Sequence, residues 1–176
     1  VLLTKPERLD IQSLDDIRGK KLAAVDPASF GGWLIHRLLL KQAGIDPHSD
    51  VGSIVFLGSH RKVVFDVLNG KADVGEVRTG IVEQMEQEGI LDHTRYRVLN
   101  RQENPPFPLA RSTGLYPNWA LAKMVHVSSQ LAEQVMFNFI NIEASSDAAR
   151  AARIQGWTIP LDYYPVHHCL QELKAQ

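Results

Sequence analysis

The stretch VDPASFGGWLIHRLLL, residues 25–40, decides the fold of this chain. Its first residue, Val25, is the last of a short apolar run, residues 21–25, that stops at Asp26 and Pro27. The chain then passes Ser29 and two glycines and continues as an apolar stripe with helical spacing. This order predicts a strand, a turn and a helix that ends at a glycine. The turn is either a plain connection or a cradle for a ligand.

The same order of strand, turn and helix repeats along the chain. Residues 53–58 and 72–77 read as further short strands, and residues 96–100 as another. A helix between each pair of strands is indicated by apolar periodicity and by glycines that end it. Because parallel strands need crossover connections, this alternation predicts an α/β fold with a mainly parallel sheet flanked by helices.

The composition excludes several classes of protein. The 176 residues are 44% hydrophobic, which is enough for a buried core, and the formal net charge of -1 is spread along the chain. We therefore expect no nucleic-acid partner, because a basic footprint is missing. Cys169 is the single cysteine, so an internal disulfide is excluded. No apolar run reaches the roughly 20 residues of a spanning helix.

The amino-acid composition and the expected secondary structure change after residue 100. Four prolines between residues 105 and 117 disfavour a helix and predict an extended connector. An amphipathic helix with Ser128 or Ser129 as its N-cap follows, then a second helix that ends at Gly156. The tail begins as an extended segment and finishes as a short helix.

Polar groups suited to an oxyanion follow three consecutive strands. In an open α/β sheet, ligands bind beyond the carboxyl ends of the strands, where helix N-termini point unpaired amides. The candidate ligand-binding residues are Ser29, Gly31, Gly32, Ser59, His60, Arg78 and Thr79. Each has a plainer interpretation: the serines as N-caps, His60 as a surface or capping residue, and Arg78 as the partner of a nearby acid such as Glu76 or Glu83. Convergence at equivalent strand ends favours the binding interpretation.

Signatures of catalysis, metal binding and cofactor binding are absent from the sequence. It contains no nucleophile elbow, phosphate-binding loop, dinucleotide fingerprint or zinc-protease motif. His167, His168 and Cys169 are adjacent, so on a helix they point in different directions and suit one metal ion poorly. Asp73 and Glu76 have no evident nucleophile or partner acid, and we expect solvated or capping roles for them. We expect no cofactor and no metal.

Several spaced blocks resemble a known family. GKKLAAVDPASFGGWLIHRLLLKQAGIDP, FLGSH and VVFDVLNGKADVGEVRTG are similar to the PhnD-like, phosphate/phosphonate-type periplasmic solute-binding proteins. STGLYPNWALAKMVHVSSQLAEQV and GWTIPLDYYPVHHCLQEL resemble the PhnD-like sensor domains of bacterial membrane histidine kinases, including tetrathionate-sensor-like kinases. The resemblance covers nearly the whole chain.

The resemblance implies a type-2 periplasmic-binding-protein-like fold with a ligand between two lobes. It implies an inter-lobe crossing segment at residues 1–12, a second lobe at 13–104, and a return crossing with C-terminal helices of the first lobe at 105–176. The N-terminal part of that first lobe is then missing from this chain. Residues 128 onward should have lost partners, which leaves an apolar patch for a possible homodimer.

The resemblance also bears on the site. Asp26, Pro27, Ser29 and Gly32 match the family's binding turn, DP-x-S-T-S-G, whereas Phe30 and Gly31 replace hydroxyl residues. The GSH and VRT turns match as well, and Ser112 and Thr113 fit the crossing segment of the sensors.

The function implied is an extracytoplasmic, periplasmic sensing domain that binds a small anionic solute. Membrane attachment would come only through a following transmembrane helix in a parent two-component histidine kinase. A solute-binding subunit of a phosphonate-type ABC transporter is the alternative on the same fold. An enzyme using His60 or the carboxylates near Asp73 is the alternative from another class.

Overall fold

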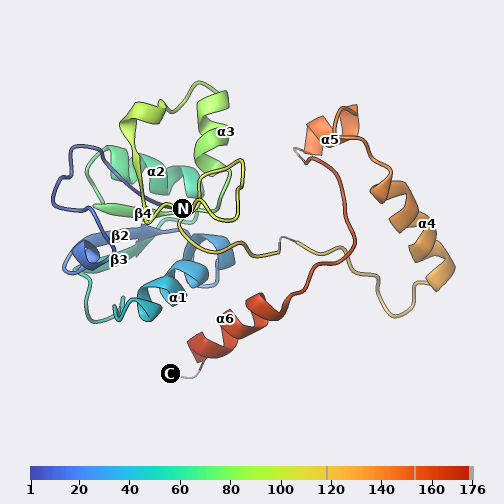
Figure 1. Cartoon of the computed structure of the whole chain (residues 1–176), viewed down its shortest axis with the longest axis horizontal. Helices are drawn as coiled ribbons and strands as arrows, with labels where there is room; N and C mark the ends of the chain where they lie inside the picture. Colours follow the sequence, from blue (N-terminus) through green and yellow to red (C-terminus); the bar gives the residue numbers. More distant parts are fainter. Residues whose placement is uncertain (118, 153, 175–176) are drawn as a thin grey trace. The chain divides into compact units, whose positions relative to one another are not determined.

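The computed structural model describes residues 1–117, 119–152 and 154–174. Its centre is a five-stranded sheet in the order β3-β2-β4-β1-β5 (Figure 1). The strands are β1 (Leu2–Thr4), β2 (Lys21–Ala24), β3 (Ser53–Phe56), β4 (Val74–Glu76) and β5 (Arg97–Leu99).

Four of these strands run in one direction. β2 pairs in parallel with β3, where Ala23 lies opposite Val55, and with β4, where Ala23 lies opposite Gly75. β1 is antiparallel to both β4 and β5, so β5 has the direction of β4. The expected mainly parallel α/β sheet is confirmed. β1 was not expected as a strand, because its three residues carry too little periodic signal to be read from the sequence.

Helices supply the crossovers between the parallel strands, as parallel pairing requires. α1 (Ile35–Gln42) joins β2 to β3, α2 (His60–Leu68) joins β3 to β4, and α3 (Ile81–Gln87) joins β4 towards β5. α1 lies on one side of the sheet and α2 and α3 on the other (Figure 1). The sheet is therefore a middle layer that holds the strand ends in fixed positions.

Each face of the sheet has its own apolar core. On the α2 and α3 side, Leu3, Val63 and Val82 belong to one cluster of fully buried side chains. On the α1 side, Leu22, Leu40 and others form a second cluster. The alternation of side chains along the strands sends successive residues to opposite faces, which explains why Leu2 and Leu3 belong to different clusters.

The chain divides into two compact units. Unit 1 comprises residues 1–115 and 166–176, and unit 2 comprises residues 116–165. Unit 1 contains the sheet and α1 to α3. The expected division of the chain into lobes at residues 12 and 104 stays a prediction.

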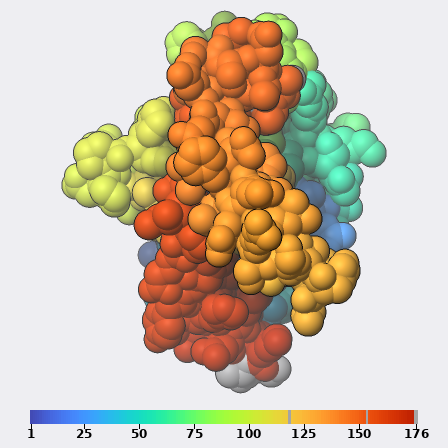
Figure 2. Space-filling model, turned by 90° about the vertical axis from the view of Figure 1, so that its right-hand side faces the viewer, coloured from blue at the N-terminus to red at the C-terminus, as the bar shows by residue number. Residues whose placement is uncertain are grey.

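Unit 2 contains α4 (Ser129–Ile140) and α5 (Asp147–Ala152). Ser128 is the N-cap of α4, as expected, and its hydroxyl accepts a hydrogen bond from Leu131 N at 3.2 Å. The helix has no buried residue, and Phe137 is 69% exposed. Its exposed apolar side chains, on the orange segment of Figure 2, are Leu131, Val135, Met136, Phe137 and Ile140.

α6 (Tyr164–Lys174) returns to unit 1. Lys41 Nζ on α1 donates to Glu172 O at 2.7 Å. Cys169 is buried and its Sγ lies 3.9 Å from Leu34 O, whereas His168 Nε2 lies 4.0 Å from Glu172 Oε1 along the helix surface. The neighbouring side chains of the His-His-Cys run therefore serve different contacts.

No helix in the described parts of the chain combines the length and apolar character that crossing a membrane requires.

Candidate functional site

The turns after β2, β3 and β4 meet at one edge of the sheet, because these strands are parallel and adjacent. The backbone joins the first two turns: Leu57 N donates to Ala24 O at 3.0 Å, and Gly58 N donates to Val25 O at 2.8 Å. Gly58 has a φ of 70°, a conformation that a residue without Cβ adopts readily. This edge carries all seven candidate residues.

The turn after β2 begins a helix directly. Ser29 is extended, with φ -69° and ψ 111°, and it is the N-cap of a π-helical turn, η2 (Phe30–Leu34), which continues as α1. Its hydroxyl accepts a hydrogen bond from Gly32 N at 3.2 Å. The plainer interpretation of Ser29 as a capping residue therefore holds. Capping leaves the hydroxyl proton for another acceptor.

Close packing around position 32 leaves room only for glycine. A Cβ at this position would lie 2.6 Å from Val25 Cγ2 and 2.8 Å from Ser29 Oγ. Both distances are shorter than real Cβ contacts, so the backbone of the turn reaches this position only with glycine.

Arg78 brings the turns after β2 and β4 together. A Cβ at Gly31 would lie 3.1 Å from Arg78 Cγ and 3.3 Å from Arg78 Cβ, so the arginine stem crosses Gly31. The guanidinium carries a permanent charge and a fork of donors that matches an oxyanion.

His60 joins the turn after β3 to the turn after β4. Arg78 N donates to His60 Nδ1 at 3.2 Å, so Nδ1 is the acceptor and Nε2 carries the proton of a neutral imidazole. Partial burial and, after it, the positive charge of Arg78 lower the pKa of His60 to about 4. The ring is thus a neutral N–H donor at neutral pH.

Ser59 and Thr79 are half-buried neighbours of His60 and Arg78. Ser59 is extended and precedes α2, but its hydroxyl makes no cap hydrogen bond with that helix. The capping interpretation, which holds for Ser29, therefore fails for the Ser59 side chain. The structure brings Arg78 into contact with both Gly31 and His60, and Ser59 and Thr79 are their neighbours in the chain.

A buried acid and imidazole lie behind this edge. His36 on α1 and Glu76 at the end of β4 are both fully buried, with His36 Nδ1 3.8 Å from Glu76 Oε2. This separation is too long for a hydrogen bond. Burial raises the pKa of Glu76 well above its ordinary value and lowers the pKa of His36 well below its own. The solvated or capping role expected for Glu76 is wrong. Asp73 accepts from Lys21 N, at the start of the strand β2, at 2.8 Å and pairs with Arg8, so its role is to join these segments and not to cap a helix.

The pair predicts a pH dependence of folding. Glu76 keeps its proton in the folded chain and loses it in the unfolded chain above about pH 4.5, so the free energy of unfolding falls as pH rises towards the raised pKa. His36 stays neutral when folded but binds a proton when unfolded, so stability also falls as pH drops below about 6.5. We expect Glu76→Gln to remove the decline on the alkaline side, measured by urea unfolding over a pH series. An equal effect of the exposed control Glu103→Gln would contradict this.

Ser112 and Thr113 make hydrogen bonds that fix the crossing segment. Ser112 Oγ accepts from Leu2 N at 2.8 Å and donates to Leu99 O at 2.7 Å, which joins the crossing segment to β1 and β5. Thr113 Oγ1 donates to Gly114 O at 2.9 Å, and Thr113 O accepts from the buried Arg111 at 2.9 Å. These bonds hold the segment against the sheet.

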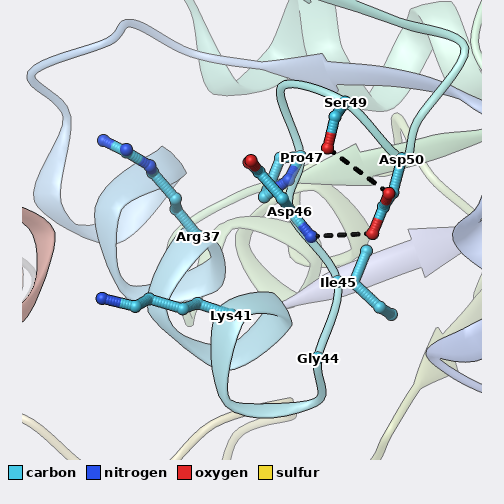
Figure 3. A pocket seen from close by; sticks show the side chains of 8 residues that line it. All are labelled: Arg37, Lys41, Gly44, Ile45, Asp46, Pro47, Ser49 and Asp50. Carbon is cyan, nitrogen blue, oxygen red and sulfur yellow. Dashed lines mark hydrogen bonds between the residues drawn. The ribbon is translucent and has the colours of Figure 1, made fainter. Parts of the chain in front are cut away.

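A separate pocket of about 230 Å³ lies at the other end of α1 (Figure 3). Arg37 and Lys41 extend from the helix on one side, and the loop after Gly44 forms the other. Its aspartates have partners within the protein: Asp50 accepts from Asp46 N at 3.0 Å and pairs with Arg18. No candidate residue of the sequence lines it.

Comparison with known proteins agrees with this architecture. The chain is 31% identical over 175 residues to the tetrathionate sensor histidine kinase TtrS of Salmonella typhimurium, covering 99% of this chain and 28% of the relative. The structure of PhnD1 from Prochlorococcus marinus in complex with methylphosphonate superposes with a TM-score of 0.67 at 12% identity, over 100% of this chain and 66% of that one. A Xanthomonas citri protein bound to ATP gives a TM-score of 0.61 at 20% identity, over 99% and 64% of the two chains.

This chain therefore spans less than two thirds of each of these relatives. The likeness to the solved structures confirms the expected type-2 periplasmic-binding-protein fold. The family described as "ABC transporter, phosphonate, periplasmic substrate-binding protein" matches residues 1–162. The chain belongs to this family of periplasmic solute-binding proteins, and the expected relationship to the sensor domain of a histidine kinase is confirmed.

Proposed function

We propose that the edge formed by the turns after β2, β3 and β4 binds a small oxyanion. The observation that carries this proposal is the position of Arg78, whose backbone is held by His60 and whose stem crosses Gly31. Three turns that are distant in sequence thereby converge on one permanent cation. Such a group binds phosphonate, sulfonate or carboxylate oxygens through paired charge-assisted hydrogen bonds.

Neutral donors surround that cation in the proposed site. His60 offers Nε2–H, and the hydroxyls of Ser29, Ser59 and Thr79 lie on the same turns. Two helices, η2–α1 and α2, also begin at this edge, and helix N-termini favour negative charge. The site therefore combines one fixed charge with several neutral donors, which suits an anionic head group.

The biological role that we propose is extracytoplasmic sensing in a two-component histidine kinase. The 31% identity to a tetrathionate sensor kinase supports a sensor over a transport subunit. In a sensor, the ligand shifts an equilibrium between conformations by as much as it prefers one of them. The family match also supports the alternative, a solute-binding subunit of an ABC transporter. Kinase motifs in the same reading frame as this chain would decide for the sensor.

Binding can be tested with the anions that the relatives' names suggest. We expect tetrathionate or methylphosphonate to raise the midpoint of thermal unfolding of the chain in a concentration-dependent way, because a ligand that binds only the folded state stabilises it. Sodium chloride at the same ionic strength is the control. No stabilisation by any sulfur or phosphorus oxyanion would contradict the proposed function.

The pH dependence of binding follows from His60. Its pKa of about 4 leaves the ring neutral between about pH 5.5 and 8, so this donor does not change its charge over that interval. We therefore expect the affinity for tetrathionate, measured by isothermal titration calorimetry, to stay constant over this interval. A step in affinity near the ordinary histidine pKa would show that His60 binds the anion in its charged form instead.

The exposed apolar side chains of α4 support a proposal of self-association. Their contiguous exposure is typical of a surface that is covered by another chain or segment. We expect the average mass in light scattering to rise with protein concentration and Phe137→Glu to suppress the rise. Arg150→Glu, an exposed change on α5, is the control. A strictly monomeric chain at all concentrations would contradict this.

A further inference from the structure

We infer that Gly31 is a specificity-determining position, because the absence of a side chain there lets Arg78 bring its charge to the turn after β2. This inference rests on the oxyanion site proposed above and gives Gly31 a different role within it. Gly31 makes room for a protein cation, whereas a glycine in a cradle is usually taken to make room for the ligand.

The three atoms nearest to a Cβ at Gly31 all belong to one side chain. A Cβ at this position would lie 3.1 Å from Arg78 Cγ, 3.3 Å from Cβ and 3.7 Å from Cδ. Three consecutive stem carbons therefore lie along the glycine. The φ of Gly31 is not in the left-handed region, so the backbone itself does not demand glycine. The requirement comes from the arginine.

The Arg78 stem has little freedom to move aside. Its backbone N–H is bonded to His60 Nδ1, and the atoms closest to Gly31 are the first two carbons of the side chain. A side chain at position 31 would press on the first two stem carbons, so the stem has to shift by a few tenths of an ångström rather than only its flexible end. We expect a shift at these carbons to be passed on to the guanidinium at the end of the stem and to change its position at the turn.

A side chain at position 31 and the stem of Arg78 therefore compete for the same space in the site. With glycine at position 31, the Arg78 stem lies along the turn after β2 and brings the charged guanidinium fork to it. With alanine or serine, the fork is displaced, and serine supplies a neutral hydroxyl in its place. The preference for an anion over a neutral solute depends on this one position.

A double-mutant cycle tests the coupling. We expect Gly31→Ala to weaken binding of tetrathionate or methylphosphonate by about tenfold or more, and to change it less than about twofold in an Arg78→Ala background. Gly114→Ala is the matched control, because a Cβ at Gly114 meets nothing within 4 Å. Gly31→Ser is the second variant, and we expect it to weaken anion binding as Gly31→Ala does, because the hydroxyl that it supplies is neutral. Equal effects of Gly31→Ala in both backgrounds, or no effect in either, would overturn the inference.

A second measurement needs no ligand. The charge of Arg78 contributes to the low pKa of His60, so the His60 titration followed by NMR reports where the guanidinium lies. We expect Gly31→Ala to change the pKa of His60 and Gly114→Ala to leave it unchanged. An unchanged His60 titration in Gly31→Ala would refute the inference even if anions bind. If neither anion binds the native chain but Gly31→Ala alters the titration, the proposed function fails and the coupling stands.

Discussion

Arg78→Ala is expected to reduce the affinity for tetrathionate or methylphosphonate by about thirtyfold, since a charge-assisted hydrogen bond contributes about 2 kcal/mol. The loss follows from the site's composition: His60 is neutral, so Arg78 is the cation that the three converging turns share. Calorimetric titration of the native chain and the variant measures the effect. Arg78→Lys keeps the charge but not the planar fork, and an intermediate affinity is expected.

Arg61→Ala is the control for general loss of charge. Arg61 lies on α2, next to His60, and its guanidinium is 2.6 Å from Glu88 Oε2. The substitution removes the same charge from the same region without touching the stem that crosses Gly31. If both variants bind as the native chain does, Arg78 is not part of the site. If both lose affinity equally, the anion responds to the overall field instead of to a specific contact.

Gly32→Ala is expected to lower the free energy of unfolding by about 2 kcal/mol, because overpacking in a well-packed place typically costs 1–3 kcal/mol. The added methyl would lie 2.6 Å from Cγ2 of Val25, the residue that directly follows β2. It would also press on the Ser29 hydroxyl that caps the π turn. Urea unfolding of the native chain and the variant gives the difference.

A second substitution identifies the cause of that loss. Val25→Ala removes the closest atom, so the double variant Val25→Ala/Gly32→Ala should recover part of the difference relative to Val25→Ala alone. Gly114→Ala, where a Cβ has open space, should leave the unfolding curve unchanged. A native-like curve for Gly32→Ala would mean that the turn relaxes freely, against the packing described above.

The strands and the turns at the site could be predicted from the sequence because their signals are local. A short apolar run, a turn with glycine or serine and an apolar stripe follow one another at β2, β3 and β4, and parallel pairing then brings the turns together. The sequence also indicated Ser128 or Ser129 as the N-cap of α4, and the structure shows that it is Ser128.

Other features depend on contacts between distant residues and carry no local signal. β1 is a strand because it pairs with β4 and β5, which lie more than 70 residues away. Glu76 reads as a surface acid, yet it follows Val74 on the same face of β4 and is buried towards His36. His36 itself falls on the buried stripe of α1 between Trp33 and Leu40, and that spacing was the available signal. The Arg78 stem over Gly31 could not be foreseen, since it depends on a side-chain rotamer.

The most direct test of oxyanion binding at this edge is an NMR titration of the native chain, with amide resonances assigned, against tetrathionate and against methylphosphonate. We expect saturable shifts at Gly31, Gly32, Ser59, His60, Arg78 and Thr79, with little change around the pocket between Arg37 and Asp50. Saturable shifts confined to that pocket, or no saturable shift with either anion, would contradict it.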